Sequence, residues 1–387
     1  MKHLFLSRLV LVVLLGFGVF SEAVCVARAA LTQPAQPTVR VSVVLPFGAK
    51  GVEGSRSVEF YRGFLMAVDV VKQRGINVCV NAYDEGTPRT DIAPILERVS
   101  ATHPDLLIAP VYPSHFESVS AFATRATLPT AVPFSSRISQ ITSNPFLVAL
   151  NAPETFRSQA AVDLVAKNFG KSGQIIVVQT AEASERDFTD ALSAEMRQQG
   201  YAVATLPQSF TTAELQQVVR AGVPNLIIPD ASEVEVMRAL AERVRLYRTA
   251  HSADNIALLG YPEWGGEAAR NAAVLHEANT YILTPSFYNT YDVCTRNLEA
   301  DYKIAFGSVP TDMTPRLFLL GYDFGLYALV GIAEGGATFW GSKTPAVAQL
   351  QTDFRFARPS AGCGFVNTCM WMLHYKTDRS IDKISRI

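Results

Sequence analysis

Small hydroxyl and acidic side chains recur where apolar segments of this chain end. In the first half, two such clusters follow the apolar runs 106–111 and 130–134, and residues 116–126 between the runs are apolar at helical spacing. A strand–helix–strand unit of this kind has parallel strands, and ligands of open parallel sheets bind beyond the carboxyl ends of the strands. We therefore expect the wall of a small-molecule site here. Its candidate residues are Tyr112, Ser114, Ser135 and Ser136.

The second half repeats the pattern after three further apolar runs. Hydroxyl groups and backbone N–H groups at helix starts would suit a carboxylate, and acidic residues would suit an ammonium group. Aromatic rings would cover an apolar body. Taken singly, each residue could equally be a turn or helix-cap residue. The candidates are Thr180, Asp230, Ser232, Tyr261, Glu263 and Trp264.

Motifs that mark enzymes are missing from the sequence. No H-E-x-x-H, G-x-S-x-G or spaced Cys/His set occurs. The segments 170–172 and 336–344 both fail the phosphate-binding pattern. His115 lies beside the expected site, where we interpret it as a surface residue at a helix start. We expect no catalytic residue, metal ion or cofactor, and keep a hydrolase as the lesser alternative.

Composition and charge narrow the class of protein. The 387 residues are 49% hydrophobic and 18% charged, which supplies ample core material and excludes general disorder. A formal charge of -1 argues against nucleic acid or an anionic membrane as partner. Four of the five cysteines lie beyond residue 29. We interpret Cys79 as a buried apolar residue, and Cys363 and Cys369 as either a disulfide pair or free thiols.

The N-terminus has the pattern of an export signal. Basic residues precede the apolar run 9–20, and Ala27-Arg28-Ala29 provides a small-x-small cleavage site. We therefore predict a signal peptide over 1–29, a tether over 30–38 and a periplasmic location. Cys25 leaves lipoprotein anchoring as a weaker alternative.

Strand and helix patterns alternate twice along the chain, from 39 to 151 and from 152 to about 280. Two α/β layers with mostly parallel sheets are the expected fold. Residues 48–57 are expected to form a loop. The remaining predicted elements are strands at 280–287 and 354–356, helices at 298–306 and 316–331, and a hairpin of strands 370–375 and 381–384.

Four segments resemble a known family. They are Tyr61–Asp69 with the following Gly75-Ile76, Leu107–Val111, Pro133–Ser136 and Gly362–Tyr375. They resemble the type I periplasmic solute-binding proteins of the branched-chain amino-acid receptor group, which serve ABC transporters, and most of all relatives of the Bacteroidetes type.

The resemblance implies two lobes joined by a hinge of three chain crossings and closing over a ligand. Lobe 1 would comprise 39–151 plus 284–340, and lobe 2 would comprise 152–283 plus 341–387. It also implies ligand contacts: Ser114, Ser135 and Ser136 on the carboxylate side, Thr180 and Asp230 in the facing lobe, and Glu263 near the amine. Arg137 departs from the family pattern and would alter the charge preference of the site.

The function expected from the sequence is capture of a small polar ligand, an amino acid or short peptide-like molecule, in the interlobe cleft for transport or sensing. The expected partners are that ligand and either an ABC transporter permease or an envelope protein, and no nucleic acid. The alternative is a cell-envelope interaction scaffold with a degenerate pocket. In a scaffold the cleft would be filled by the protein's own side chains, with Phe116, Tyr288 and Trp264 as candidates.

Overall fold

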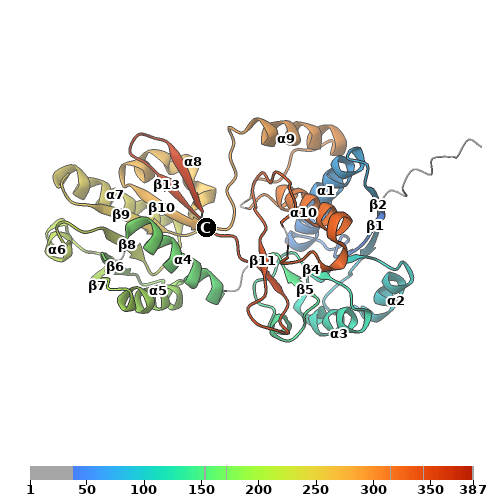
Figure 1. Cartoon of the computed structure of the whole chain (residues 1–387). Coiled ribbons are helices and arrows are strands. Elements are labelled where there is room, and N and C mark those ends of the chain that lie inside the picture. Colours follow the sequence, from blue (N-terminus) through green and yellow to red (C-terminus); the bar gives the residue numbers. More distant parts are fainter. Residues whose placement is uncertain (1–37, 152–153, 171, 314, 343, 386–387) are drawn as a thin grey trace, which may run out of the picture. The chain divides into compact units, whose positions relative to one another are not determined.

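The computed structural model describes residues 38–151, 154–170, 172–313, 315–342 and 344–385. The predicted signal peptide, nearly all of the tether and Cys25 lie outside these residues. Within them, the predicted α/β architecture is confirmed as two mostly parallel sheets of seven strands, each flanked by its own helices (Figure 1).

The first sheet has the strand order β11-β12-β5-β4-β3-β1-β2. All neighbouring strands are parallel except β11 and β12. The central strands are buried and rich in Val, Leu and Ile because helices cover both faces of the sheet, whereas the edge strand β2 is half-exposed. They are β1 (Thr38–Leu45), β2 (Asn77–Asp84), β3 (Leu106–Ile108), β4 (Thr130–Val132), β5 (Leu147–Ala149), β11 (Phe356–Ala357) and β12 (Phe365–Asn367).

The second sheet has the order β14-β13-β10-β9-β8-β6-β7. Its parallel part is completed by the predicted C-terminal hairpin, which pairs antiparallel to β10. The strands are β6 (Gln174–Gln179), β7 (Ala202–Pro207), β8 (Asn225–Pro229), β9 (Ile256–Gly260), β10 (Thr280–Thr284), β13 (Trp371–Tyr375) and β14 (Ile381–Ser385).

The helices follow the predicted alternation. One difference is that the first helix begins inside the expected loop 48–57, because Gly51 turns the chain at a φ of 87° immediately before it. The helices are α1 (Val52–Gln73), α2 (Ala93–Ala101), α3 (Phe116–Ala126), α4 (Glu154–Phe169), α5 (Arg186–Gln198), α6 (Thr212–Val218), α7 (Val234–Ala250), α8 (Trp264–Glu277), α9 (Val293–Phe306) and α10 (Leu317–Gly335).

The chain passes from one sheet to the other three times, as expected for the hinge. The passages lie after β5, after β10 and between β12 and β13. Assigning all of 341–387 to the second lobe was wrong, because β11 and β12 complete the first sheet by pairing with β5. Strand β12 is three residues long, too short to give a periodic signal in the sequence.

The thiols also differ from expectation. Cys79 is exposed on β2, although its apolar surroundings in sequence indicated burial. Cys363 and Cys369 are both free thiols. The Cys363 thiol donates to the Thr142 carbonyl oxygen at 3.3 Å.

Helices α1 and α10 pack through glycines at very short range. A Cβ atom at Gly63 would lie 1.7 Å from the Phe318 carbonyl oxygen, and one at Gly321 would lie 1.9 Å from the Phe60 carbonyl oxygen. In the described part of the chain, only α10 and its short extension have the length and apolar composition of a membrane span, but 83% of that window is buried. Such burial is typical of a core helix.

Asp323, on α10, holds the chain that follows this helix. Its fully buried carboxylate accepts backbone N–H groups from Leu350 at 2.7 Å, Gln351 at 2.9 Å and Thr352 at 2.8 Å. Burial raises the pKa of this carboxyl from 3.8 to about 7, against the opposing effect of the three N–H groups.

The glycine contact predicts a large cost for a single methyl group. Gly63→Ala and Gly321→Ala should each lower the free energy of unfolding by about 1–3 kcal/mol, because the backbones must separate. Gly265→Ala is the control, since a Cβ there meets no atom within 4 Å. It should be neutral or stabilising by up to ~1 kcal/mol. Urea unfolding measures all three, and equal behaviour of the three variants would contradict the contact.

Asp323 predicts a pH dependence of stability. Between about pH 4 and 7 the folded protein keeps a proton that the unfolded chain releases, so this group's contribution falls as pH rises, by at most about 1.4 kcal/mol per unit. Asp323→Asn should remove that slope in unfolding curves measured across this range. The exposed Asp301→Asn control should keep it, and an unchanged slope in Asp323→Asn would refute the assignment.

Candidate functional site

An internal carboxylate occupies the strand-end N–H groups of the first lobe. Glu85 follows β2 and is fully buried. Its oxygens accept the backbone N–H groups of Val111 at 2.9 Å and Tyr112 at 3.0 Å, directly after β3. These are donors of the kind that the sequence analysis assigned to a ligand carboxylate, and the protein's own side chain uses them.

His115 completes this cluster. Interpreting it as a surface residue was wrong, because it is 3% exposed. Its Nδ1 lies 2.8 Å from Glu85 Oε1, and its Nε2 lies 3.0 Å from the Thr90 carbonyl oxygen. Since that carbonyl can only accept, Nε2 carries a hydrogen, and one further proton is shared between Nδ1 and the carboxyl group. Burial raises the pKa of Glu85, and the hydrogen bonds oppose this shift.

The four predicted residues of this lobe differ in side-chain exposure and in whether the protein already hydrogen-bonds their side chains. The Ser114 hydroxyl donates to the Pro88 carbonyl oxygen at 2.8 Å, and Ser135 closes a turn with the backbone of Arg137. Tyr112 is half-buried, and its pKa is raised by burial and by nearby carboxylates, Glu85 first. Ser136 and Arg137 are exposed, with no side-chain hydrogen bond among the described residues.

The second lobe contains a matching arrangement. Asp230, 1% exposed after β8, accepts the N–H and the hydroxyl of Thr180, both at 2.7 Å. Arg186 donates to its other oxygen at 3.0 Å from a half-exposed side chain. The structure therefore brings together Thr180 and Asp230, which the sequence analysis proposed as separate ligand contacts. It joins them to each other, so Asp230 is already neutralised and is a poor partner for an ammonium group.

Two predicted aromatic contacts belong to the core. Tyr261 is 1% exposed and its hydroxyl donates to the Pro229 carbonyl oxygen. Trp264 is fully buried and donates to the carbonyl oxygen of Ser232 at 3.1 Å. Neither side chain is open to a ligand, because both are packed in the core of the second lobe. Glu263 is exposed, and Ser232 is half-buried.

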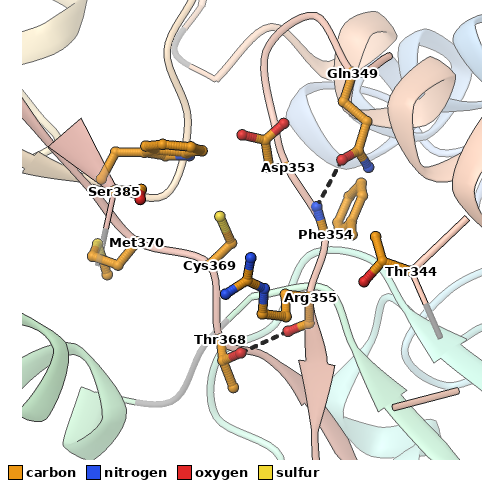
Figure 2. A pocket seen from close by; sticks show the side chains of 10 residues that line it. Thr344, Gln349, Asp353, Phe354, Arg355, Thr368, Cys369, Met370 and Ser385 are labelled. Carbon is orange, nitrogen blue, oxygen red and sulfur yellow. Dashed lines mark hydrogen bonds between the residues drawn. The ribbon is translucent and has the colours of Figure 1, made fainter. Parts of the chain in front are cut away.

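A cavity of about 190 Å³ lies elsewhere, along the third passage between the sheets (Figure 2). None of the predicted strand-end residues lines it. No group of three or more His, Cys, Asp or Glu side chains in the part of the chain that the structure describes could hold a metal ion.

Comparison with solved structures identifies the fold. The structure matches a putative branched-chain amino acid ABC transporter protein from Rhodospirillum rubrum with a TM-score of 0.61 at 13% identity, covering 90% of this chain and 99% of that one. An ABC-type branched-chain amino acid transporter protein from Rhodopseudomonas palustris matches with a TM-score of 0.57 at 13% identity, covering 90% and 95%.

A third match is the periplasmic ligand-binding protein of a branched-chain amino acid ABC transporter from Burkholderia xenovorans. Its TM-score is 0.54 at 13% identity, covering 89% of this chain and 94% of that one. No known family model matches the sequence, and no curated protein matches it. The chain thus has the fold of ABC transporter substrate-binding proteins, and the resemblance drawn from its sequence is confirmed at the level of the fold.

The Glu85 cluster predicts a measurable stability effect. Glu85→Gln places an amide NH2 group against backbone N–H donors, so the free energy of unfolding should fall by about 1–3 kcal/mol. The exposed Glu97→Gln on α2 makes the same chemical change without those partners, and it should stay within ~0.5 kcal/mol of the parent. Chemical denaturation at pH 7 compares them, and equal stabilities would exclude the carboxylate's structural role.

Proposed function

We propose that this chain is an exported, periplasmic solute-binding protein. It would capture a small polar ligand, an amino acid or short peptide-like molecule, at the strand ends of its two lobes for transport or sensing. The observation that carries the proposal is the fold, which over nine-tenths of the chain matches solved proteins named for branched-chain amino acid transport.

The side chains at the strand ends support a charged, polar ligand, and their exposure indicates which of them could contact it. Glu85 and Asp230 are already engaged within the protein, so the ligand must use the exposed groups. We propose that Ser136 and Arg137 bind a carboxylate and that Glu263 approaches an ammonium group. Binding needs no covalent chemistry, since the ligand shifts a conformational equilibrium only through its differential contacts. The proposed partner is an ABC transporter permease.

One observation favours the scaffold alternative. The Val111 and Tyr112 N–H groups bind Glu85, so part of the site that a ligand carboxylate would use is closed. The three proposed fillers give no further support. Phe116 and Trp264 pack within their own lobes, and the Tyr288 hydroxyl donates at 2.7 Å to Glu299 on α9.

Ligand binding tests the proposal directly. Native mass spectrometry of freshly purified protein should reveal a bound small molecule, and a panel of amino acids and short peptides should raise the melting temperature. Arg137→Ala should weaken binding of the identified ligand about tenfold, because a charge-assisted hydrogen bond is lost.

Arg197→Ala is the matched control, an exposed arginine in the last turn of α5, away from the strand ends. It should leave binding unchanged. A protein that carries no co-purified molecule and shows no thermal shift with any compound would refute the binding function and favour the scaffold.

A further inference from the structure

One edge of the first sheet is formed by β2, which stands at the end of the strand order and pairs on one side with β1 (Figure 1). Its eight residues make it the longest of the four edge strands in the two described sheets. A free edge presents a row of unpaired backbone groups, and native proteins usually protect it with proline, charged side chains or a very short strand.

The other three edges carry such protection. Strand β11 has only two residues, β7 ends at Pro207, and β14 contains Asp382 and Lys383. Strand β2 has no proline, and its one charged residue is Asp84 at its last position. Every residue of β2 is exposed or half-buried. This edge is therefore the one best suited to pairing with another strand.

The backbone of β2 shows which groups point away from the sheet. The Glu85 N–H donates to the Leu45 carbonyl oxygen on β1 at 2.9 Å. Successive residues of a strand turn their backbone groups to opposite sides, so Cys79 also turns its groups toward β1, whereas Val78 and Val80 turn theirs outward. No hydrogen bond to these outward N–H and C=O groups occurs within the described residues.

We propose that β2 pairs antiparallel with β2 of a second copy of this chain, which joins two first sheets into one continuous sheet. Charge favours this partner and this direction. The exposed Lys72 and Arg74 precede β2, and the exposed Asp84 ends it. Antiparallel pairing brings the basic start of one strand beside the acidic end of the other, whereas parallel pairing sets like charges together. Identical strands paired about a two-fold axis form a closed dimer.

Cys79 defines the register of this pair. With Cys79 on the two-fold axis, Val78 lies opposite Val80 of the second copy, and Asn77 lies opposite its Asn81. Since Val78 and Val80 already pack against the first core, their pairing extends an apolar face. The two Cys79 residues form a non-hydrogen-bonded pair, whose Cα separation of about 4.5 Å falls within the roughly 4.4–6.8 Å of disulfides. Both thiols are free and exposed.

Analytical ultracentrifugation of the protein under reducing conditions tests the dimer. The parent should self-associate reversibly, and Val80→Pro should raise the dimer dissociation constant at least about tenfold, because an outward N–H is lost and the proline ring occupies the edge. Pairing with β1 does not use this N–H, so the variant should fold. Val80→Thr is the matched control, since it keeps both the N–H and the branched side chain, and it should leave association unchanged.

Disulfide trapping tests the register in the folded parent. Glutathione disulfide should oxidise two Cys79 thiols to one intermolecular disulfide, with release of two molecules of reduced glutathione. Cys79→Ser should abolish the covalent dimer. Cys294 is the internal control, because this thiol on α9 is also free and exposed and should stay unlinked in Cys79→Ser. Asn81→Cys in that variant should not restore the link, because residue 81 lies opposite Asn77.

Two results would overturn the proposal. One is a folded parent protein that stays monomeric at submillimolar concentrations. The other is a dimer whose association survives Val80→Pro and whose disulfide persists in Cys79→Ser, which would place the contact elsewhere. The dimer does not depend on ligand binding at the strand ends. Arg137→Ala should therefore leave self-association unchanged, and failure of the ligand-binding proposal would leave the dimer intact.

Discussion

The buried carboxylate of Asp323 orders the segment that holds the chain leaving the second sheet after β10. It ties residues 350–352 to α10, and Gln351 within that segment exchanges hydrogen bonds with the Arg316 backbone at the start of the same helix. The Gln351 carbonyl oxygen also accepts the Phe287 N–H at 2.9 Å, from the chain that leaves β10. The passage that follows β10 is thus fastened to this short segment. Helix α10 in turn packs against α1 through the glycine contact, so this passage is anchored to the first core.

Both lobes use the same device at their strand ends. In each, an internal carboxylate binds backbone N–H groups next to a parallel strand and is compensated by a cationic or titratable side chain, His115 in one lobe and Arg186 in the other. Such donors converge at this edge of any parallel sheet because the strands and the following helices point their N–H groups there. A carboxylate supplied by the chain keeps the edge ordered without a ligand. What is left for a ligand is the exposed groups next to these carboxylates, such as Ser136 and Arg137 in the first lobe and Glu263 in the second.

Much of the fold could be predicted because it follows from the spacing of apolar residues over short stretches of sequence. Parallel strands are uniform apolar runs, and their helices repeat every three to four residues, so the alternation and the C-terminal hairpin were recovered. Strand β12 and the start of α1 depend on pairing with β5 and on the positive φ of Gly51, which no local pattern records. At the site, Thr180 and Asp230 were expected as two ligand contacts, and the structure shows them bonded to each other. Glu85 was missed because a Glu in a turn is usually solvated, and only the packing of β2 beside β1 buries it against Val111 and Tyr112.

The close approach of α1 and α10 also limits how this chain can diverge. Residues 63 and 321 lie in different helices and far apart in sequence. At each position the backbone of the opposite helix leaves no space for a Cβ atom. A substitution at one position cannot be relieved by a smaller residue at the other, because the clashing atoms are backbone carbonyl oxygens that every residue carries. Glycine at both positions is therefore a two-residue signature by which distant descendants of this sequence could be recognised after overall identity has been lost.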